Sequence, residues 1–123
     1  MHLFLFASRD DAPRQRLRSA IHEVIADEAV ESFGSLDDFR ERLHRIVEPD
    51  SIAVLVALNR EELLKMQILR KLLPEIYVVL VLPDRTESTL ELAHLLLPRF
   101  LAHRDDPFAD LQGVLLKMAG HSR

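Results

Sequence analysis

Two apolar runs in the middle of the chain constrain the fold most strongly: residues 52–58 (IAVLVAL) and 76–82 (IYVVLVL). Neither alternates apolar with polar residues, as a strand with one face in water does. Such runs indicate strands covered on both faces, which is typical of the centre of a parallel sheet flanked by helices. Three shorter runs, 2–7, 29–33 and 99–103, bring the predicted strands to five.

A segment with helical periodicity follows each predicted strand. Apolar residues recur three and four positions apart, which predicts amphipathic helices with one buried face. Asn59 reads as the N-cap of the third helix, and Asp106 as the N-cap of the fifth, with Pro107 at its first position. The predicted helices cover 12–28, 34–47, Asn59 to just before Pro74, 90–97, and Pro107 to Gly120.

The order strand–helix, repeated five times, predicts an α/β fold built from right-handed βαβ units. For five strands, the leading layout is a flavodoxin-like (βα)5 three-layer sandwich with parallel sheet order 2-1-3-4-5. In that order the two double-faced runs lie inside the sheet, and the weaker run 29–33 lies at an edge. With 123 residues, the chain fits a single domain over 1–123.

Composition excludes several classes of protein. The net charge is −4, from 16 basic and 20 acidic residues, so we expect no nucleic acid partner. Without cysteine, the chain has no disulfide or thiolate metal site. No apolar stretch approaches the length of a membrane span, and the N-terminal apolar run lacks a basic leader. We therefore predict a cytoplasmic protein that does not enter a membrane.

An acidic pair follows the first predicted strand. Asp10 and Asp11 are weak candidates for a hard cation such as Mg²⁺, because carboxylate oxygens are its preferred ligands. The alternative is that they cap the following helix, where the helix dipole favours negative charge. No third oxygen ligand is evident, so we predict no metal site.

The other strand exits carry little reactive chemistry. Ala57 and Leu58 end the third run, Leu82 ends the fourth, and His103 ends the fifth and is followed by Arg104. The chain's three glycines form no phosphate-binding loop, and no serine or histidine falls in a common catalytic motif. We therefore predict no cofactor and no enzymatic activity.

The second half of the chain resembles the receiver domains of response regulators. The resemblance rests on ILRKLLPEIYVVLVLPD (68–84) and on STLELAHLLLPRFLAHRDDPFADLQGVLLKM (88–118), and extends more loosely over nearly the whole chain. In that family an aspartate at the end of the third strand accepts a phosphoryl group, and an acidic pair after the first strand binds magnesium. A hydroxyl after the fourth strand and a lysine after the fifth contact the phosphoryl group.

Set against that pattern, the resemblance implies a degenerate phosphorylation pocket. The aspartate position falls on Ala57, the hydroxyl position on Leu82 and the lysine position on His103. Asp10 and Asp11 lie two or three residues after the usual place of the acidic pair. The resemblance therefore implies a pseudo-receiver that is not phosphorylated on the usual aspartate.

The predicted function is a signalling or regulatory domain that acts through protein–protein contact. True receivers use the face made by the fourth helix, fifth strand and fifth helix, so we expect a protein partner, or a homodimer, at that face. The predicted interface residues are Leu92, Leu95, Leu96 and Phe100.

Two alternatives remain open. One is a small-ligand sensor or enzyme that binds a metabolite or nucleotide between Asp10, Asp11, His103 and Arg104. The other is a degraded receiver that still takes up a phosphoryl group on Asp10 or Asp11.

Overall fold

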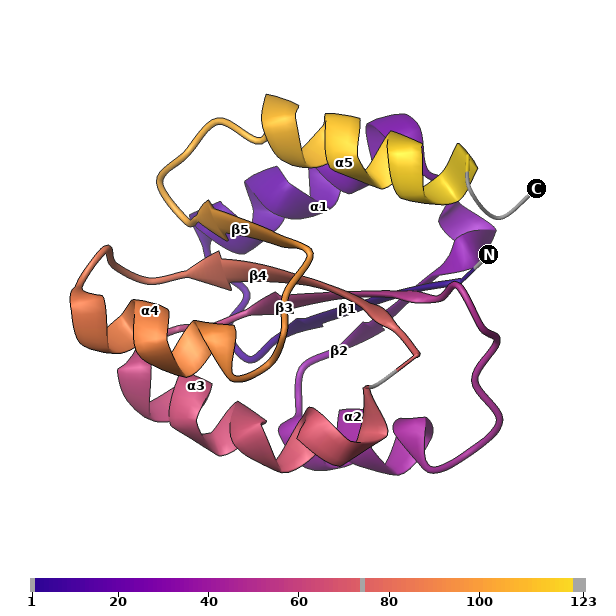
Figure 1. The fold of residues 1–123 in the computed structure, drawn as a ribbon. Helices are drawn as coiled ribbons and strands as arrows, with labels where there is room; N and C mark the ends of the chain where they lie inside the picture. Colours follow the sequence, from indigo (N-terminus) through magenta and orange to yellow (C-terminus); the bar gives the residue numbers. More distant parts are fainter. Residues whose placement is uncertain (1, 74, 121–123) are drawn as a thin grey trace.

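The computed structural model describes residues 2–73 and 75–120, and these fold into a three-layer α/β sandwich (Figure 1). Its five parallel strands lie in the order β2-β1-β3-β4-β5, as the alternating pattern predicted. The strands are β1 (Leu3–Ala7), β2 (Val30–Phe33), β3 (Ile52–Val56), β4 (Tyr77–Leu82) and β5 (Phe100–His103). The predicted flavodoxin-like fold is therefore confirmed.

Helices cover both faces of the sheet, which is why β3 and β4 are apolar along their whole length. In Figure 1, α1 and α5 pack above the sheet, and the other helices pack below it. The α-helices are α1 (Ala12–Val24), α2 (Leu36–Leu43), α3 (Arg60–Lys65), α4 (Glu87–His94) and α5 (Ala109–Gly120). Two short 3-10 helices, η1 (Asp27–Ala29) and η2 (Met66–Leu72), complete the chain of elements.

Each face of the sheet builds its own core. Leu17 and Ile21 of α1 meet Leu111 and Leu115 of α5 over one face. On the other face, Phe39 lies against the rings of Phe4 and Phe6, with ring centroids 5.8 and 6.0 Å apart. Burial of a large apolar side chain contributes about 1.5–3 kcal/mol, so these two layers account for the length of the apolar runs.

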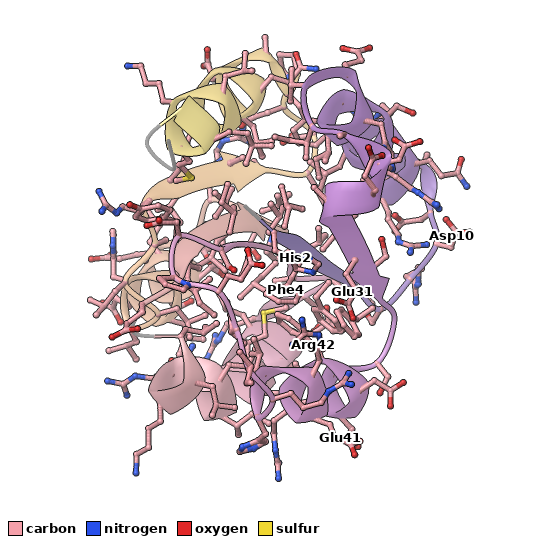
Figure 2. All side chains as sticks on the ribbon, turned by 90° about the vertical axis from the view of Figure 1, so that its right-hand side faces the viewer. His2, Phe4, Asp10, Glu31, Glu41 and Arg42 are labelled. Atoms are coloured by element: carbon pink, nitrogen blue, oxygen red, sulfur yellow. The ribbon has the colours of Figure 1, made fainter. Side chains whose placement is uncertain are left out.

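At the β2 edge of the sheet, a network of side-chain contacts joins His2, Glu31, Arg42 and Phe4 (Figure 2). Glu31 of β2 accepts from His2 Nε2 at 2.9 Å and from Arg42 Nε of α2 at 3.2 Å. The Arg42 guanidinium lies over the Phe4 ring, 5.0 Å from its centroid. These contacts fasten a short, half-exposed strand to β1 and α2.

All five helices differ from their predicted bounds: α1 ends at Val24 instead of residue 28, and α2 covers Leu36–Leu43 instead of 34–47. The third helix is α-helical only to Lys65 and continues as 3-10 helix η2, and Pro74, its predicted stop, lies outside the described residues. The fourth helix ends at His94 rather than at Leu97. Among residues 2–73 and 75–120, no helix is long and apolar enough to cross a membrane.

The fifth helix begins at Ala109, two residues later than predicted. Asp106 does not cap it, because its carboxylate instead accepts from the backbone N–H of His103 at 3.1 Å. That bond, with Asp106 N–H donating to the His103 carbonyl at 2.9 Å, makes a tight turn after β5. An aspartate side chain that forms a turn of this kind competes with helix capping.

Candidate functional site

The carboxyl edge of the sheet, where all five strands end, is where ligands bind in open α/β folds. At this edge we define the acceptor corner as Ala57, Leu82 and His103, which follow or end β3, β4 and β5. Ala57 and Leu82 are both 0% exposed. The Ala57 N–H donates to the Val81 carbonyl at 3.0 Å, and Leu82 is in register with His103. The corner is thus filled by hydrocarbon and closed by the backbone of the neighbouring strands.

The acidic pair after β1 is engaged locally. Asp11 is the N-cap of α1, and its side chain accepts from the Arg14 N–H at 3.1 Å. Asp10 is exposed and pairs with the Arg14 guanidinium at 3.1 Å (Figure 2). Over the part of the chain that the structure describes, no group of three or more His, Cys, Asp or Glu residues is placed to hold a metal ion.

A hydrogen-bonded bridge that the sequence did not predict spans the mouth of the carboxyl edge. Ser8, after β1, donates its hydroxyl to Glu62 of α3 at 2.5 Å. The other carboxylate oxygen of Glu62 accepts from the Leu58 N–H at 2.9 Å. Glu62 lies three residues after the N-cap Asn59, so it reaches back over the helix start much as the glutamate of a capping box does.

A second bridge joins the loops after β4 and β5. The Arg85 guanidinium donates to Asp106 at 2.7 Å and to both carboxylate oxygens of Asp105 at 3.3 Å. The hydrogen bond from Arg85 lowers the pKa of Asp105 below its ordinary value. Arg85 and Asp105 are both exposed, so their ion pair orders the two loops more than it stabilises the fold.

The loop after β4 is also tied to the start of α4. Asp84 accepts from the Thr86 backbone N–H at 3.0 Å and from its hydroxyl at 2.7 Å. These bonds, the backbone one first, lower the pKa of the Asp84 carboxyl. Thr86 is itself the N-cap of α4, so Asp84 fixes the turn that precedes the helix.

His103 and Arg104 do not join the acidic pair. The His103 Nδ1 atom lies 3.5 Å from an Asp106 oxygen, and its Nε2 atom is buried without a hydrogen-bond partner among the described residues. The Arg104 carbonyl accepts from the Arg16 guanidinium at 2.7 Å. Among the described residues, no hydrogen bond or ion pair joins Asp10 or Asp11 to His103 or Arg104.

The predicted interface is only partly exposed. Leu92 and Phe100 are half-buried, and Leu95 is 46% exposed. Leu96 is 5% exposed and packs in the core, so little of its side chain is accessible to a partner. Leu97, which the sequence analysis did not single out, is 84% exposed because its backbone turns out of the helix at φ 53°.

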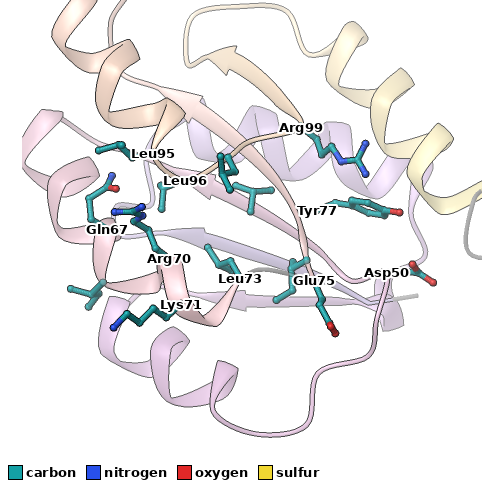
Figure 3. A pocket seen from close by; sticks show the side chains of 14 residues that line it. Asp50, Gln67, Arg70, Lys71, Leu73, Glu75, Tyr77, Leu95, Leu96 and Arg99 are labelled. Carbon is teal, nitrogen blue, oxygen red and sulfur yellow. The ribbon is translucent and has the colours of Figure 1, made fainter.

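The amino edge of the sheet, where the strands begin, is shaped differently. A groove of about 640 Å³ lies there between η2 and the turn after α4, with Tyr77 and Val78 of β4 among its lining residues (Figure 3). We call it the amino-edge groove. Ile68 and Leu97 line it and are at least half exposed, so apolar side chains meet water at this opening.

Three solved structures have the same fold over nearly the whole of this chain. A candidate pilus assembly-related protein from Burkholderia pseudomallei is 24% identical, with a TM-score of 0.67 over 98% of this chain and 90% of that one. A candidate pilus assembly protein (cpaE) from Burkholderia thailandensis is 25% identical, with a TM-score of 0.64 over 98% and 99%. A CheY-like response regulator protein from Mesorhizobium loti is 16% identical, with a TM-score of 0.62 over 99% and 98%.

A comparison with models of protein families gives no match, and neither does a comparison with curated proteins. The structural matches establish a receiver-like fold, which confirms the fold that the resemblance implied.

Proposed function

We propose that residues 1–123 form one receiver-like regulatory domain that acts by binding a protein, without phosphoryl transfer to the usual aspartate position and without enzymatic activity. The domain works in the cytoplasm and needs neither a cofactor nor a metal ion. The candidate pilus assembly proteins among its structural neighbours make a pilus assembly system the context to examine first.

One observation carries the proposal: Ala57 is wholly buried at the position where a receiver holds its phosphoacceptor. A methyl group has no oxygen to attack a phosphoryl donor. Leu82 supplies no hydroxyl at the end of β4, and Asp11 is occupied as the cap of α1. The residues around the acceptor corner therefore stabilise the fold instead of binding a phosphoryl group.

The surface made by α4, β5 and α5 is the proposed site of partner contact. Among the predicted interface residues on this surface, Leu95 is the most accessible, at 46% exposure. Leu92 and Phe100 are half-buried. Exposed apolar side chains favour association because contact removes them from water. A second copy of the chain is the first partner to test.

Two measurements test the proposal. Incubation with acetyl phosphate and Mg²⁺ followed by intact-mass measurement is expected to show no phosphoryl adduct, while a receiver with an intact aspartate, treated in parallel, gains one. An adduct on Asp10 or Asp11 would contradict the proposal. A thermal-shift screen with nucleotides, flavin and divalent ions is expected to leave the melting temperature unchanged; a clear rise with a metabolite would favour a small-ligand sensor.

The interaction itself is tested by sedimentation over a concentration series. Leu95→Asn should shift the protein towards the monomer, whereas Ile46→Asn should not, because Ile46 is 93% exposed but follows α2 and lies outside the α4–β5–α5 surface. Equal association of both variants would remove Leu95 from the contact surface.

A further inference from the structure

The amino-edge groove has the features of a contact surface. Ile68 of η2 is 50% exposed, and Leu95 and Leu97 after α4 are 46% and 84% exposed. All three line the same groove, so the apolar side chains form one patch instead of being scattered singly. Patches of this kind mark interaction sites more often than isolated exposed leucines do.

Leu97 is held outward by its backbone. Its φ of 53° lies in the left-handed region, which costs a residue with a side chain about 1 kcal/mol or more. A glycine or asparagine would adopt this conformation more easily. The chain thus keeps a leucine where the conformation disfavours it and where water surrounds it, and such strained positions are common at binding surfaces.

Charged residues flank the apolar patch on two sides. Arg70 and Lys71 of η2 lie at the left of the groove in Figure 3, and Asp50 and Glu75 lie at its lower right. Within residues 2–73 and 75–120, none of these four side chains forms an ion pair within 4.0 Å. Arg99 lies on the acidic side but is stacked on the Tyr77 ring, 4.7 Å from its centroid.

This arrangement is complementary to itself. In a dimer with two-fold symmetry, each subunit offers the same surface, and a residue on one side of the axis faces a residue from the other side of the partner. A two-fold axis along the groove brings the Arg70 and Lys71 side of one copy to the Asp50 and Glu75 side of the other. The exposed leucines and Ile68 then lie between the two charged junctions and are removed from water.

We propose that the amino-edge groove is a self-association surface that takes a second copy of this chain, with the Lys71 side of one copy facing the Glu75 side of the other. This inference rests on the proposed function, because it names the partner of the domain as a second copy of the chain. It places the contact at the groove after the C-terminal end of α4 instead of on the α4–β5–α5 face. Leu95 borders both surfaces, so substitutions elsewhere must distinguish them.

Charge reversal at the two junctions tests the proposal. Lys71→Glu and Glu75→Lys, each alone, place like charges opposite one another at both junctions and should weaken the dimer about tenfold or more, as sedimentation equilibrium would measure. A mixture of the two variants should form a heterodimer of restored affinity, and the double variant K71E/E75K should dimerise with itself. Restoration is expected only where the two side chains face each other across a symmetric interface.

Leu97→Asn tests the apolar part of the surface, with Leu116→Asn as the matched control. Asparagine keeps the left-handed backbone, so the variant should fold normally, as circular dichroism would check, yet dimerise about tenfold or more weakly. Leu116→Asn should dimerise like the original chain.

The outcomes separate this inference from the proposed function. A chain that stays monomeric at every concentration overturns the inference, and so does a dimer that persists unchanged in K71E, E75K and L97N. In the first case a different protein partner, and in the second a dimer through the α4–β5–α5 face, still satisfies the proposed function. A phosphoryl adduct on the chain would overturn the proposed function whatever the result at the groove.

Discussion

The two ends of the sheet have opposite characters. At the carboxyl edge, side chains are buried or hydrogen-bonded within the fold: Ala57 is buried, Asp11 caps α1, and Glu62 bonds both Ser8 and Leu58. At the amino edge, apolar side chains meet water and charged ones have no ion-pair partner among the described residues. Apart from the buried His103 Nε2 atom, the carboxyl edge is held by bonds within the fold, whereas the amino edge leaves apolar side chains in water.

Under the proposed function, the fold keeps its scaffold while its contact surface lies away from the acceptor corner. The parallel sheet needs apolar strands whether or not a phosphoryl group is bound at their ends, because burial between two helical layers stabilises it. Chemistry at the acceptor corner needs particular oxygen and nitrogen atoms there, and Ala57 and Leu82 have none in their side chains. The comparison predicts that substitutions at the carboxyl edge change stability, whereas substitutions of the exposed side chains of the amino-edge groove change association.

The largest effect is expected for Ala57→Asp, which returns a carboxylate to the acceptor position. Ala57 is 0% exposed, so the new carboxylate would be buried without a cationic partner and should lower the free energy of unfolding by about 3–5 kcal/mol. Urea denaturation measures this loss.

Ala109→Asp is the matched control for that substitution. Ala109 is exposed in the first turn of α5, where the helix dipole favours a negative charge, so stability should be unchanged or slightly higher. If A57D were as stable as the original chain and took up a phosphoryl group, the carboxyl edge would be a working site after all.

The next effect contrasts two adjacent leucines at the amino edge. Leu96→Ala should lower the free energy of unfolding by about 3 kcal/mol, because Leu96 is 5% exposed and its loss leaves a cavity in the core. Leu97→Asn should cost nothing or stabilise slightly, since it relieves a strained backbone and removes an exposed side chain. Equal losses in the two variants, measured by thermal or urea unfolding, would mean that Leu97 is part of the core in solution.

A smaller loss is expected for Glu62→Ala at the carboxyl edge. The variant loses the bonds to the Ser8 hydroxyl and the Leu58 N–H and should be destabilised by about 1–2 kcal/mol. Glu61→Ala is the control, because Glu61 is its exposed neighbour on the same helix turn. If both variants lost the same small amount, the bridge across the mouth of the edge would not contribute to stability.

The sequence predicted the sheet because strand order depends on long patterns. Runs 52–58 and 76–82 are apolar on both faces, and only central strands of a covered parallel sheet need that pattern. The cap at Asn59 was also visible, because it depends on one residue and the helix that follows it.

The boundaries and the amino-edge groove were not predictable in the same way. Three successive leucines at 95–97 have the same hydrophobicity, and the periodicity of a helix cannot say which faces water once the helix stops at His94. Asp106 looks like an N-cap in the sequence, yet its carboxylate accepts from the backbone N–H of His103, three residues earlier. The groove joins η2, β4 and the turn after α4, so it exists only when the chain has folded.

The smallest predicted effect concerns acid stability at the loop after β4. Hydrogen bonds from Thr86 hold the pKa of Asp84 below 3.8, so its ionised form is favoured by the folded state. A depressed pKa stabilises the fold above the unfolded value, and this contribution is lost as the pH falls through the folded value. Asp84→Asn should therefore be less stable than the original chain near neutral pH, and the difference in stability should close below about pH 3.8.

Because Asp105 has a depressed pKa through its hydrogen bond with Arg85, the double variant D84N/D105N should lose more of the acid dependence than either single variant. Urea unfolding at a series of pH values measures the difference in stability. If the difference in the free energy of unfolding stayed constant on acidification, the loop bonds of the carboxyl edge would not persist in solution. This edge would then be less ordered than the amino edge.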